Sequence, residues 1–242
     1  LVQTPEGMRQ RFNIDIRVKS EVLSIDVHKK QVEVQNRDTD ESYFESYDKL
    51  ILSPGAEPLK PPIPGIDGKN IFTLRNVRDT FQIKDYIDNS ECKEAVVVGG
   101  GFIGLEMAEN LHHRGVRVTI VEMADQVMAP MDYEMAAIIH EYLNTKDIKL
   151  VLRDGVRSFG QERDSILVEL ESGAKLKTDL VILAIGVRPE STLAESAGLE
   201  IGETRGIKVN KHLQTSNPHI YAVGDAVEIV DLINGSPALI PL

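Results

Sequence analysis

One segment near the middle of the chain constrains the fold more than any other. An apolar run over residues 95–98 ends at the glycine-rich turn 99–104, whose sequence is Gly-Gly-Gly-Phe-Ile-Gly. Apolar residues then repeat at helical spacing over residues 102–114, Gly115 can close that helix, and a second apolar run spans residues 116–121. A strand, a tight turn, a helix and a strand in this order predict a βαβ unit with parallel strands and a right-handed crossover.

Three glycines give this turn the pattern of a nucleotide-binding site. Gly99 permits a tight exit from the strand, Gly101 lets the backbone approach a phosphate, and Gly104 lets the helix pack against the sheet. Pyrophosphate needs backbone N–H donors and a positive electrostatic end, and the start of a helix provides both. We therefore expect a dinucleotide here. The alternative is a glycine turn that serves helix packing only.

Glu122 follows the second strand, about 20 residues beyond the turn, where dinucleotide-binding units place an acidic residue. A carboxylate there accepts hydrogen bonds from the adenine-ribose hydroxyls and repels a 2′-phosphate. Met123 and Ala124 supply no arginine to offset that repulsion. The sequence thus favours NAD(H) over NADP(H), and the alternative is that Glu122 is a solvated strand end.

The rest of the chain alternates between strand and helix patterns. Thr4 and Pro5 are typical of a helix start, and this helix is expected to end near Phe12. Several prolines after residue 55 favour a domain boundary there. Further helices are expected at residues 76–89 and 132–145, and strands at 14–18, 22–27, 32–34, 49–52, 148–152, 165–170, 175–183 and 220–223.

Composition and charge limit the partners of the chain. It has 242 residues, of which 27% are charged, and a formal net charge of −11. Because a negative surface repels phosphate backbones and anionic lipid, and no basic patch stands out, we expect no nucleic acid and no membrane partner. The single cysteine, Cys92, excludes an internal disulfide, and a reducing cytoplasm is the expected location.

Four separated segments resemble one family of flavoproteins. Residues 50–55 resemble the turn at which these reductases leave the FAD domain, and residues 97–109 resemble their NAD turn. Residues 183–190 are similar to a second turn of the same type as that at residues 50–55. Residues 215–225 are similar to the second FAD motif of these reductases. On these segments the chain is identified as a member of the pyridine nucleotide-disulfide oxidoreductases.

The resemblance implies a fold and a division into domains. The fold is α/β: a three-layer, Rossmann-type NAD-binding domain, with a parallel sheet and a β-meander, inserted in a partial FAD-binding domain. The NAD-binding domain would span residues 56–188, and the FAD-binding domain residues 1–55 and 189–242. Within the family, residues 1–22 and 234–239 look most like the coenzyme A-disulfide reductase and NADH oxidase group.

The resemblance also implies which residues contact the cofactors. Phe102 would lie over the nicotinamide pocket and move aside when NADH enters; an aromatic buried in the core is the alternative. Asp225 would bind the flavin ribityl chain, with a strand-end turn residue as its alternative. The residues expected to contact NAD are Gly99, Gly101, Phe102, Ile103, Gly104, Glu106, Glu122 and Gly186. Those expected to contact FAD are Val22, Ser53, Gly55, Gly224 and Asp225.

Three parts of the family pattern do not occur in residues 1–242. They are the first FAD glycine turn, the redox-active cysteine in a Cys-Gly-Leu-Pro-Tyr-like context, and the C-terminal dimerisation domain. Cys92 does not replace that cysteine, because the flanking Glu91 and Glu94 disfavour a thiolate. Since Leu1 is also not an initiator, the chain is expected to be a fragment without catalytic or metal-binding residues of its own.

The parent enzyme is expected to pass electrons from NADH to FAD and then to a disulfide or oxygen. It would act on a small-molecule substrate as a homodimer, and the fragment alone would be inactive. Two alternatives stay open. The chain could be an NAD(H)-binding module without electron transfer, or part of a ferredoxin or nitrite reductase flavoprotein.

Overall fold

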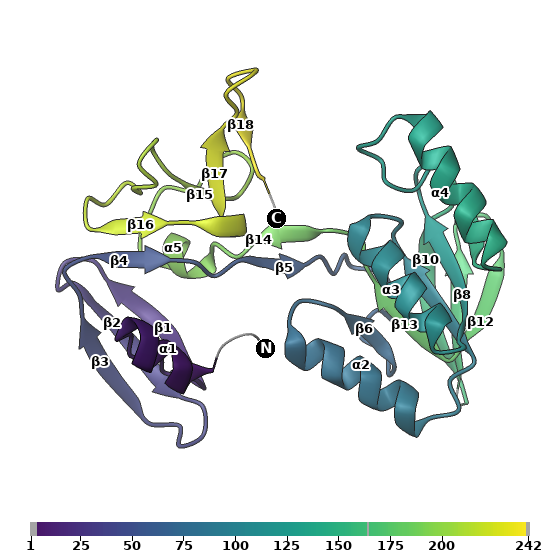
Figure 1. The fold of residues 1–242 in the computed structure, drawn as a ribbon, viewed down its shortest axis with the longest axis horizontal. Coiled ribbons are helices and arrows are strands. Elements are labelled where there is room, and N and C mark those ends of the chain that lie inside the picture. The colour runs from purple at the N-terminus through teal and green to yellow at the C-terminus, as the bar shows by residue number, and fades with distance from the viewer. Residues whose placement is uncertain (1–3, 164, 241–242) are drawn as a thin grey trace. The chain divides into compact units, whose positions relative to one another are not determined.

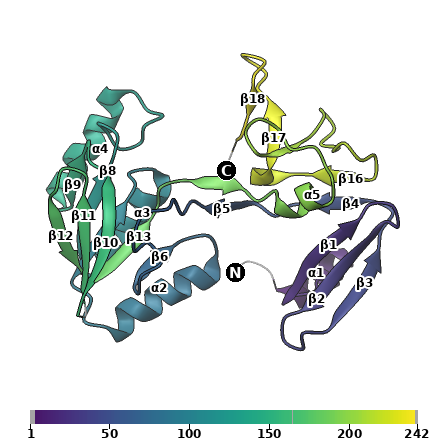
Figure 2. The same cartoon turned by 180° about the vertical axis from the view of Figure 1, so that it is seen from behind.

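The computed structural model of the chain describes residues 4–163 and 165–240, and these residues form two compact units (Figures 1 and 2). The inserted unit is Glu57–Arg188, and the outer unit combines the described residues of the ranges 1–56 and 189–242. Each unit has its own buried cores, so each is described by itself.

A five-stranded parallel sheet forms the centre of the inserted unit. Its strand order is β6-β13-β7-β8-β9, and every neighbouring pair runs parallel. β7 and β13 are short runs of apolar residues that are buried on both faces, as expected for inner strands of a parallel sheet. The strands are β6 (Ile71–Thr73), β7 (Glu94–Val98), β8 (Arg117–Glu122), β9 (Lys149–Leu152) and β13 (Leu180–Leu183).

Different layers cover the two faces of this sheet. Val97 packs in a core with residues of α2 (Val77–Asn89), α3 (Phe102–His113) and α4 (Tyr133–Thr145). Its neighbours Val96 and Val98 pack in the other core, under an antiparallel sheet. Helices, parallel sheet and β-meander are therefore stacked in three layers, and the expected Rossmann-type α/β fold is confirmed.

The β-meander corrects one predicted strand. Its strands are β10 (Val156–Glu162), β11 (Ser165–Leu170) and β12 (Lys175–Thr178), and β10 was not predicted. The predicted strand 175–183 is two strands, because the chain leaves the meander after Thr178 and enters the parallel sheet at Leu180. Asp179 fixes this corner by accepting hydrogen bonds from the backbone N–H groups of Lys93 and Glu94, at 2.9 and 3.0 Å.

The outer unit consists of small sheets around one core. β4 and β16 pair in parallel, Leu50 beside Ile220 and Leu52 beside Ala222, and both strands contribute buried residues to that core. Its helices are α1 (Pro5–Phe12), α5 (Thr192–Ser196) and the 3₁₀ turn η1 (Gly224–Ala226). Its strands are β1 (Ser20–Asp26), β2 (Gln31–Asn36), β3 (Ser42–Ser46), β4 (Leu50–Leu52), β15 (Ile207–Lys208), β16 (Ile220–Ala222), β17 (Val227–Val230) and β18 (Pro237–Ala238).

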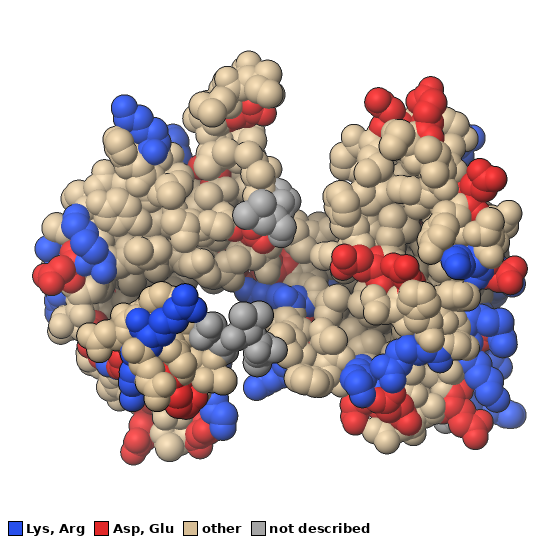
Figure 3. Space-filling view, in the orientation of Figure 1, with Lys and Arg blue, Asp and Glu red and all other residues tan. Residues whose placement is uncertain are grey.

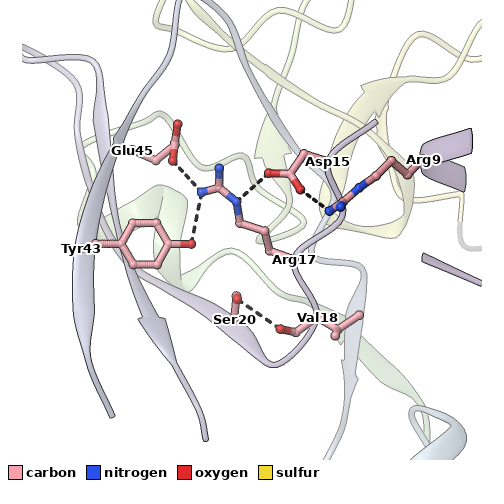
Figure 4. A network of polar contacts seen from close by, with 7 residues as sticks. All are labelled: Arg9, Asp15, Arg17, Val18, Ser20, Tyr43 and Glu45. Carbon is pink, nitrogen blue, oxygen red and sulfur yellow. Dashed lines mark hydrogen bonds and ion pairs between the residues drawn. The ribbon is translucent and has the colours of Figure 1, made fainter. Parts of the chain in front are cut away.

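The predicted strand at residues 14–18 is wrong. Asn13 and Lys19 have left-handed backbone conformations, with φ of 53° at each, and the segment between them has no strand partner among the described residues. Side chains hold it instead (Figure 4). Arg17 donates to Asp15 at 2.9 Å and to Glu45 of β3 at 2.5 Å. Alternating apolar residues alone did not make a strand here, because a strand also needs a neighbouring strand to pair with.

Two short strands mark where the chain enters and leaves the inserted unit. β5 (Ala56–Pro58) and β14 (Val187–Pro189) form a two-stranded sheet. On the face shown in Figure 3, positive side chains lie among negative ones in each unit. Within the described parts of the chain, every helix is too short or too polar to cross a membrane.

Candidate functional site

The glycine turn leaves no room for side chains at two of its positions. Gly99 has a φ of +106°, and a Cβ atom there would lie 2.2 Å from the carbonyl oxygen of Ala184, which follows β13. A Cβ atom at Gly104 would lie 2.0 Å from the carbonyl oxygen of Gly99. α3 therefore starts in direct backbone contact with the turn, and only glycine fits at both places.

The third glycine of the pattern faces open space. A Cβ atom at Gly101 would have no neighbour within 4 Å. Gly101 is the N-cap residue of α3, and the first turn of that helix carries no acidic side chain. The approach to Gly101, at the positive end of the helix, is thus open, and the binding of a phosphate there stays a prediction. The packing interpretation applies to Gly99 and Gly104 but leaves Gly101 unexplained.

Glu122 is part of the turn as well as the end of β8. Its Oε2 atom accepts the N–H of Gly100 at 2.6 Å, and its Oε1 atom accepts the N–H of Ala124 at 2.8 Å. The interpretation as a solvated strand end is therefore wrong. Because a carboxylate oxygen can accept more than one hydrogen bond, both oxygens still have capacity for ribose hydroxyls.

The segment after β8 packs against the glycine turn, and sequence analysis did not predict this contact. Val127 is fully buried, and a Cβ atom at Gly100 would lie 2.8 Å from its Cγ1 atom. The N–H of Met128 donates to the carbonyl of Gly100 at 2.9 Å. An apolar Val-Met pair within a polar loop was the only signal in the sequence that these residues are buried.

The side chains expected near the nicotinamide lie at the start of α3. Phe102 is 69% exposed, so the alternative of a core aromatic is wrong. Phe102 and Glu106 line a groove of about 290 Å³ between α3 and α4, and Ile103 is 37% exposed. Gly186, with a φ of +109°, follows β13 at the same carboxyl edge of the sheet as the glycine turn. The glycine turn, Glu122 and Gly186 thus lie at this edge, and Phe102, Ile103 and Glu106 lie in the first two turns of α3.

In the outer unit, the pairing of β4 with β16 brings four of the five predicted FAD residues together. The N–H of Val223 donates to the carbonyl of Leu52 at 2.9 Å, which aligns the two strand ends. A Cβ atom at Gly224 would lie 3.8 Å from the hydroxyl of Ser53. Gly55 follows Ser53, Asp225 follows Gly224, and both glycines have positive φ, +74° and +77°.

Val22, the fifth predicted FAD residue, lies elsewhere in the outer unit. It belongs to β1, in the sheet β1-β2-β3, and is 38% exposed. The pairing of β1 with β2 is irregular between Val22 and Ser24. The structure therefore places Val22 in a different sheet from the other four residues, and its role stays a prediction.

Cys92 is shielded from redox chemistry, though mainly by a cause that the sequence did not indicate. Burial, and after it the charges of Asp179 and Glu94, together raise the pKa of the Cys92 thiol to about 11. Glu91, which was expected to contribute, is exposed and pairs with Lys93 at 3.8 Å. Among the described residues, no group of three or more His, Cys, Asp and Glu side chains could hold a metal ion.

Alkylation of Cys92 should therefore be slow and should accelerate at unusually high pH. Since the pKa of the thiol is about 11 instead of 9.0, its thiolate fraction at pH 8 should be about 100-fold lower than that of an ordinary cysteine. The rate of reaction with iodoacetamide, measured from pH 7 to 11, checks this. The chain unfolded in urea is the control. A rate in the folded protein that levels off near pH 9 would contradict the prediction.

These observations define a class of protein and then a family. The parallel sheet, its glycine turn and the three-layer stacking define an α/β protein with a Rossmann-type unit. A family model described as pyridine nucleotide-disulphide oxidoreductase matches residues 5–241. The chain belongs to this family, as the resemblance of the four segments indicated.

Known proteins from several organisms are similar to the chain over its whole length. An "NADH oxidase" of Methanocaldococcus jannaschii is 41% identical and aligns with 100% of the chain and 53% of its own length. A "Coenzyme A disulfide reductase" of Staphylococcus haemolyticus is 36% identical, over 99% of the chain and 53% of its own length. The crystal structure of reduced Bacillus anthracis CoADR-RHD superposes with a TM-score of 0.96 at 54% identity, covering 100% of the chain and 43% of that protein. The chain thus spans about half the length of the curated relatives that it matches.

Proposed function

We propose that the chain holds NADH on the inserted unit and FAD on the outer unit of a flavin-dependent NADH oxidoreductase. The observation that carries this proposal is the glycine turn. Gly99 and Gly104 are required for its shape, Gly101 faces open space at the start of α3, and Glu122 closes the turn with oxygens that can still accept hydrogen bonds. A turn that only served packing would not need an open Gly101.

Each predicted residue of the inserted unit has a role in this proposal. The backbone at Gly101 and Ile103 binds the pyrophosphate, and Glu122 accepts the adenine-ribose hydroxyls. Phe102, Glu106 and Gly186 surround the nicotinamide. The exposure of Phe102 supports a side chain that can move when NADH enters.

In the outer unit, Ser53, Gly55, Gly224 and Asp225 line the flavin, and Val22 meets the adenine of FAD. The support is that two parallel strands end side by side, since ligands of α/β proteins bind beyond the carboxyl ends of such strands. Bound NADH supplies a hydride and bound FAD accepts it, while the protein positions both.

The whole protein is proposed to pass electrons from FAD to a disulfide or to oxygen, in the cytoplasm and as a homodimer. Residues 1–242 contain no cysteine in the family's redox context, and the thiol of Cys92 stays protonated. We therefore propose that the acceptor reacts at residues outside this chain. The names of the relatives, which include an NADH oxidase and a coenzyme A disulfide reductase, support both kinds of acceptor.

Flavin absorbance tests the proposed function directly. The full-length protein that contains this chain should purify with a yellow chromophore, and NADH should bleach it under anaerobic conditions. A colourless protein that still binds NADH would support the alternative of an NAD(H)-binding module without electron transfer. A protein that binds neither compound would overturn both assignments.

Removing the carboxylate of Glu122 should weaken the preference for NADH. In the Glu122→Gln variant one oxygen remains as an acceptor, so one backbone hydrogen bond of the turn is lost and both nucleotides should bind more weakly. The charge that repels a 2′-phosphate is also lost, so we expect the ratio of NADPH to NADH dissociation constants to fall by about tenfold. Calorimetric titration with both nucleotides measures this. Glu162→Gln, on the β-meander, loses the same charge and is the control. An unchanged ratio in Glu122→Gln would contradict the role of Glu122.

A further inference from the structure

One histidine in the inserted unit makes a hydrogen bond that the proposed function does not use. The Nε2 atom of His140, on α4, accepts the backbone N–H of Val127 at 3.2 Å. A ring nitrogen that accepts a hydrogen bond carries no proton, so this contact requires the form of the ring with its proton on Nδ1. The ring of Tyr133, about two turns earlier on α4, meets the imidazole edge-on at 6.4 Å between ring centroids.

The peptide that His140 binds is the one that supports the glycine turn. Val127 is fully buried beneath Gly100, and the next residue, Met128, donates its N–H to the carbonyl of Gly100 at 2.9 Å. On its other side, the N–H of Gly100 is bound by Glu122 at 2.6 Å. Both backbone polar groups of Gly100 are therefore bound, the N–H by the last residue of β8 and the carbonyl by Met128 in the segment that follows β8.

One residue of this segment has a backbone conformation that is uncommon for residues with a Cβ atom. Met128 has a φ of 52°, in the left-handed region that residues with a Cβ atom rarely adopt. Two contacts close the loop locally: Gln126 donates its side-chain amide to the carbonyl of Met131 at 2.7 Å, and the N–H of Met131 donates to Met128 at 2.8 Å. The bond from Val127 to His140 is a further polar contact, and it joins this loop to α4.

We propose that His140 is a positioning residue for the NADH site. It acts through Val127 and Met128 on Gly100, and so sets the position of the turn and of the Glu122 carboxylate without touching the nucleotide. The inference rests on the proposed function, because it assigns His140 to the same NADH site. A histidine with a purely structural role would stabilise α4 without changing the affinity for NADH.

Two amide side chains of different length at position 140 distinguish a positioning role from a purely structural one. In His140→Gln the side-chain oxygen can reach the place of Nε2, whereas the shorter side chain of His140→Asn cannot. In the full-length protein, we expect the dissociation constant for NADH to rise about tenfold in His140→Asn and less than about threefold in His140→Gln, the range of one net hydrogen bond. The limiting rate of flavin bleaching by NADH should stay within about twofold of wild type in both, because the reacting groups are untouched.

Calorimetric titration with NADH and stopped-flow absorbance measure the two quantities, and His212→Asn, at an exposed histidine of the outer unit, is the control. Equal affinities for NADH in wild type and His140→Asn would overturn this inference but not the proposed function. Equal losses of NADH affinity in His140→Asn and His140→Gln would do the same. If His140→Asn does not fold, judged by circular dichroism, then His140→Gln decides: wild-type affinity supports the inference and a tenfold loss overturns it. A wild-type protein that does not bind NADH would overturn the proposed function itself.

Discussion

Alanine at Gly104 is expected to prevent NADH binding and to lower the free energy of unfolding by about 3 kcal/mol. The added Cβ atom would lie 2.0 Å from the carbonyl oxygen of Gly99 and 3.5 Å from the Cβ atom of Ala184. Since the closest atom belongs to the backbone, no side-chain rotation relieves the clash, and α3 has to move away from the sheet. The backbone N–H groups at its start would then no longer converge on the pyrophosphate.

Alanine at Gly101 is the matched control for this variant. It adds the same methyl group to the same turn, but into open space and at a φ of −80° that alanine tolerates. We expect a loss of stability below about 1 kcal/mol, the cost of alanine at an N-cap. NADH binding should still weaken, because the methyl group occupies the approach of the phosphate.

Urea denaturation followed by circular dichroism measures stability, which suits a chain without tryptophan, and calorimetry measures NADH affinity. Two results would count against the proposed turn. One is a Gly104→Ala variant as stable as wild type, which would show that the helix start is free to shift. The other is a Gly101→Ala variant with unchanged NADH affinity, which would show that no phosphate approaches there.

The parts of the fold that could be predicted from sequence are those with a local cause. The βαβ unit followed from an apolar run, glycines and helical spacing, because each of these acts within a few residues. The predicted strand at residues 14–18 failed because a strand also needs a partner, and spacing does not show one. The single strand predicted at 175–183 failed because Asp179 turns the chain between two sheets through hydrogen bonds to Lys93 and Glu94.

The same distinction applies to the candidate site. The glycines of the turn could be predicted because the property that matters, the lack of a side chain, belongs to each residue by itself and is read directly from the sequence. The second role of Glu122, as an acceptor for Gly100, depends on a contact across 22 positions of the chain. The bond between Val127 and His140 spans 13 positions of the chain, and the left-handed conformation of Met128 lies between the two residues. Neither contact has a sequence pattern of its own.

Loss of the Asp225 carboxylate is expected to separate the protein from its flavin. Asp225 lies in η1 directly after β16, beside the end of β4, where Ser53 and Gly55 line the same proposed site. A hydrogen bond from a ribityl hydroxyl to a carboxylate contributes about 1.5–3 kcal/mol, so Asp225→Ala should retain FAD at least about tenfold more weakly. NADH affinity, which depends on the inserted unit, should change little.

The flavin content of purified protein, taken as the absorbance ratio at about 450 and 280 nm, measures this loss. Asp225→Asn keeps the size of the side chain and an acceptor oxygen, so it should retain more flavin than Asp225→Ala. Glu195→Gln, an exposed residue on α5 of the same unit, removes one negative charge and is the control for charge alone. Wild-type flavin content in Asp225→Ala, with the fold intact, would mean that β4 and β16 end beside each other for packing and not for a cofactor.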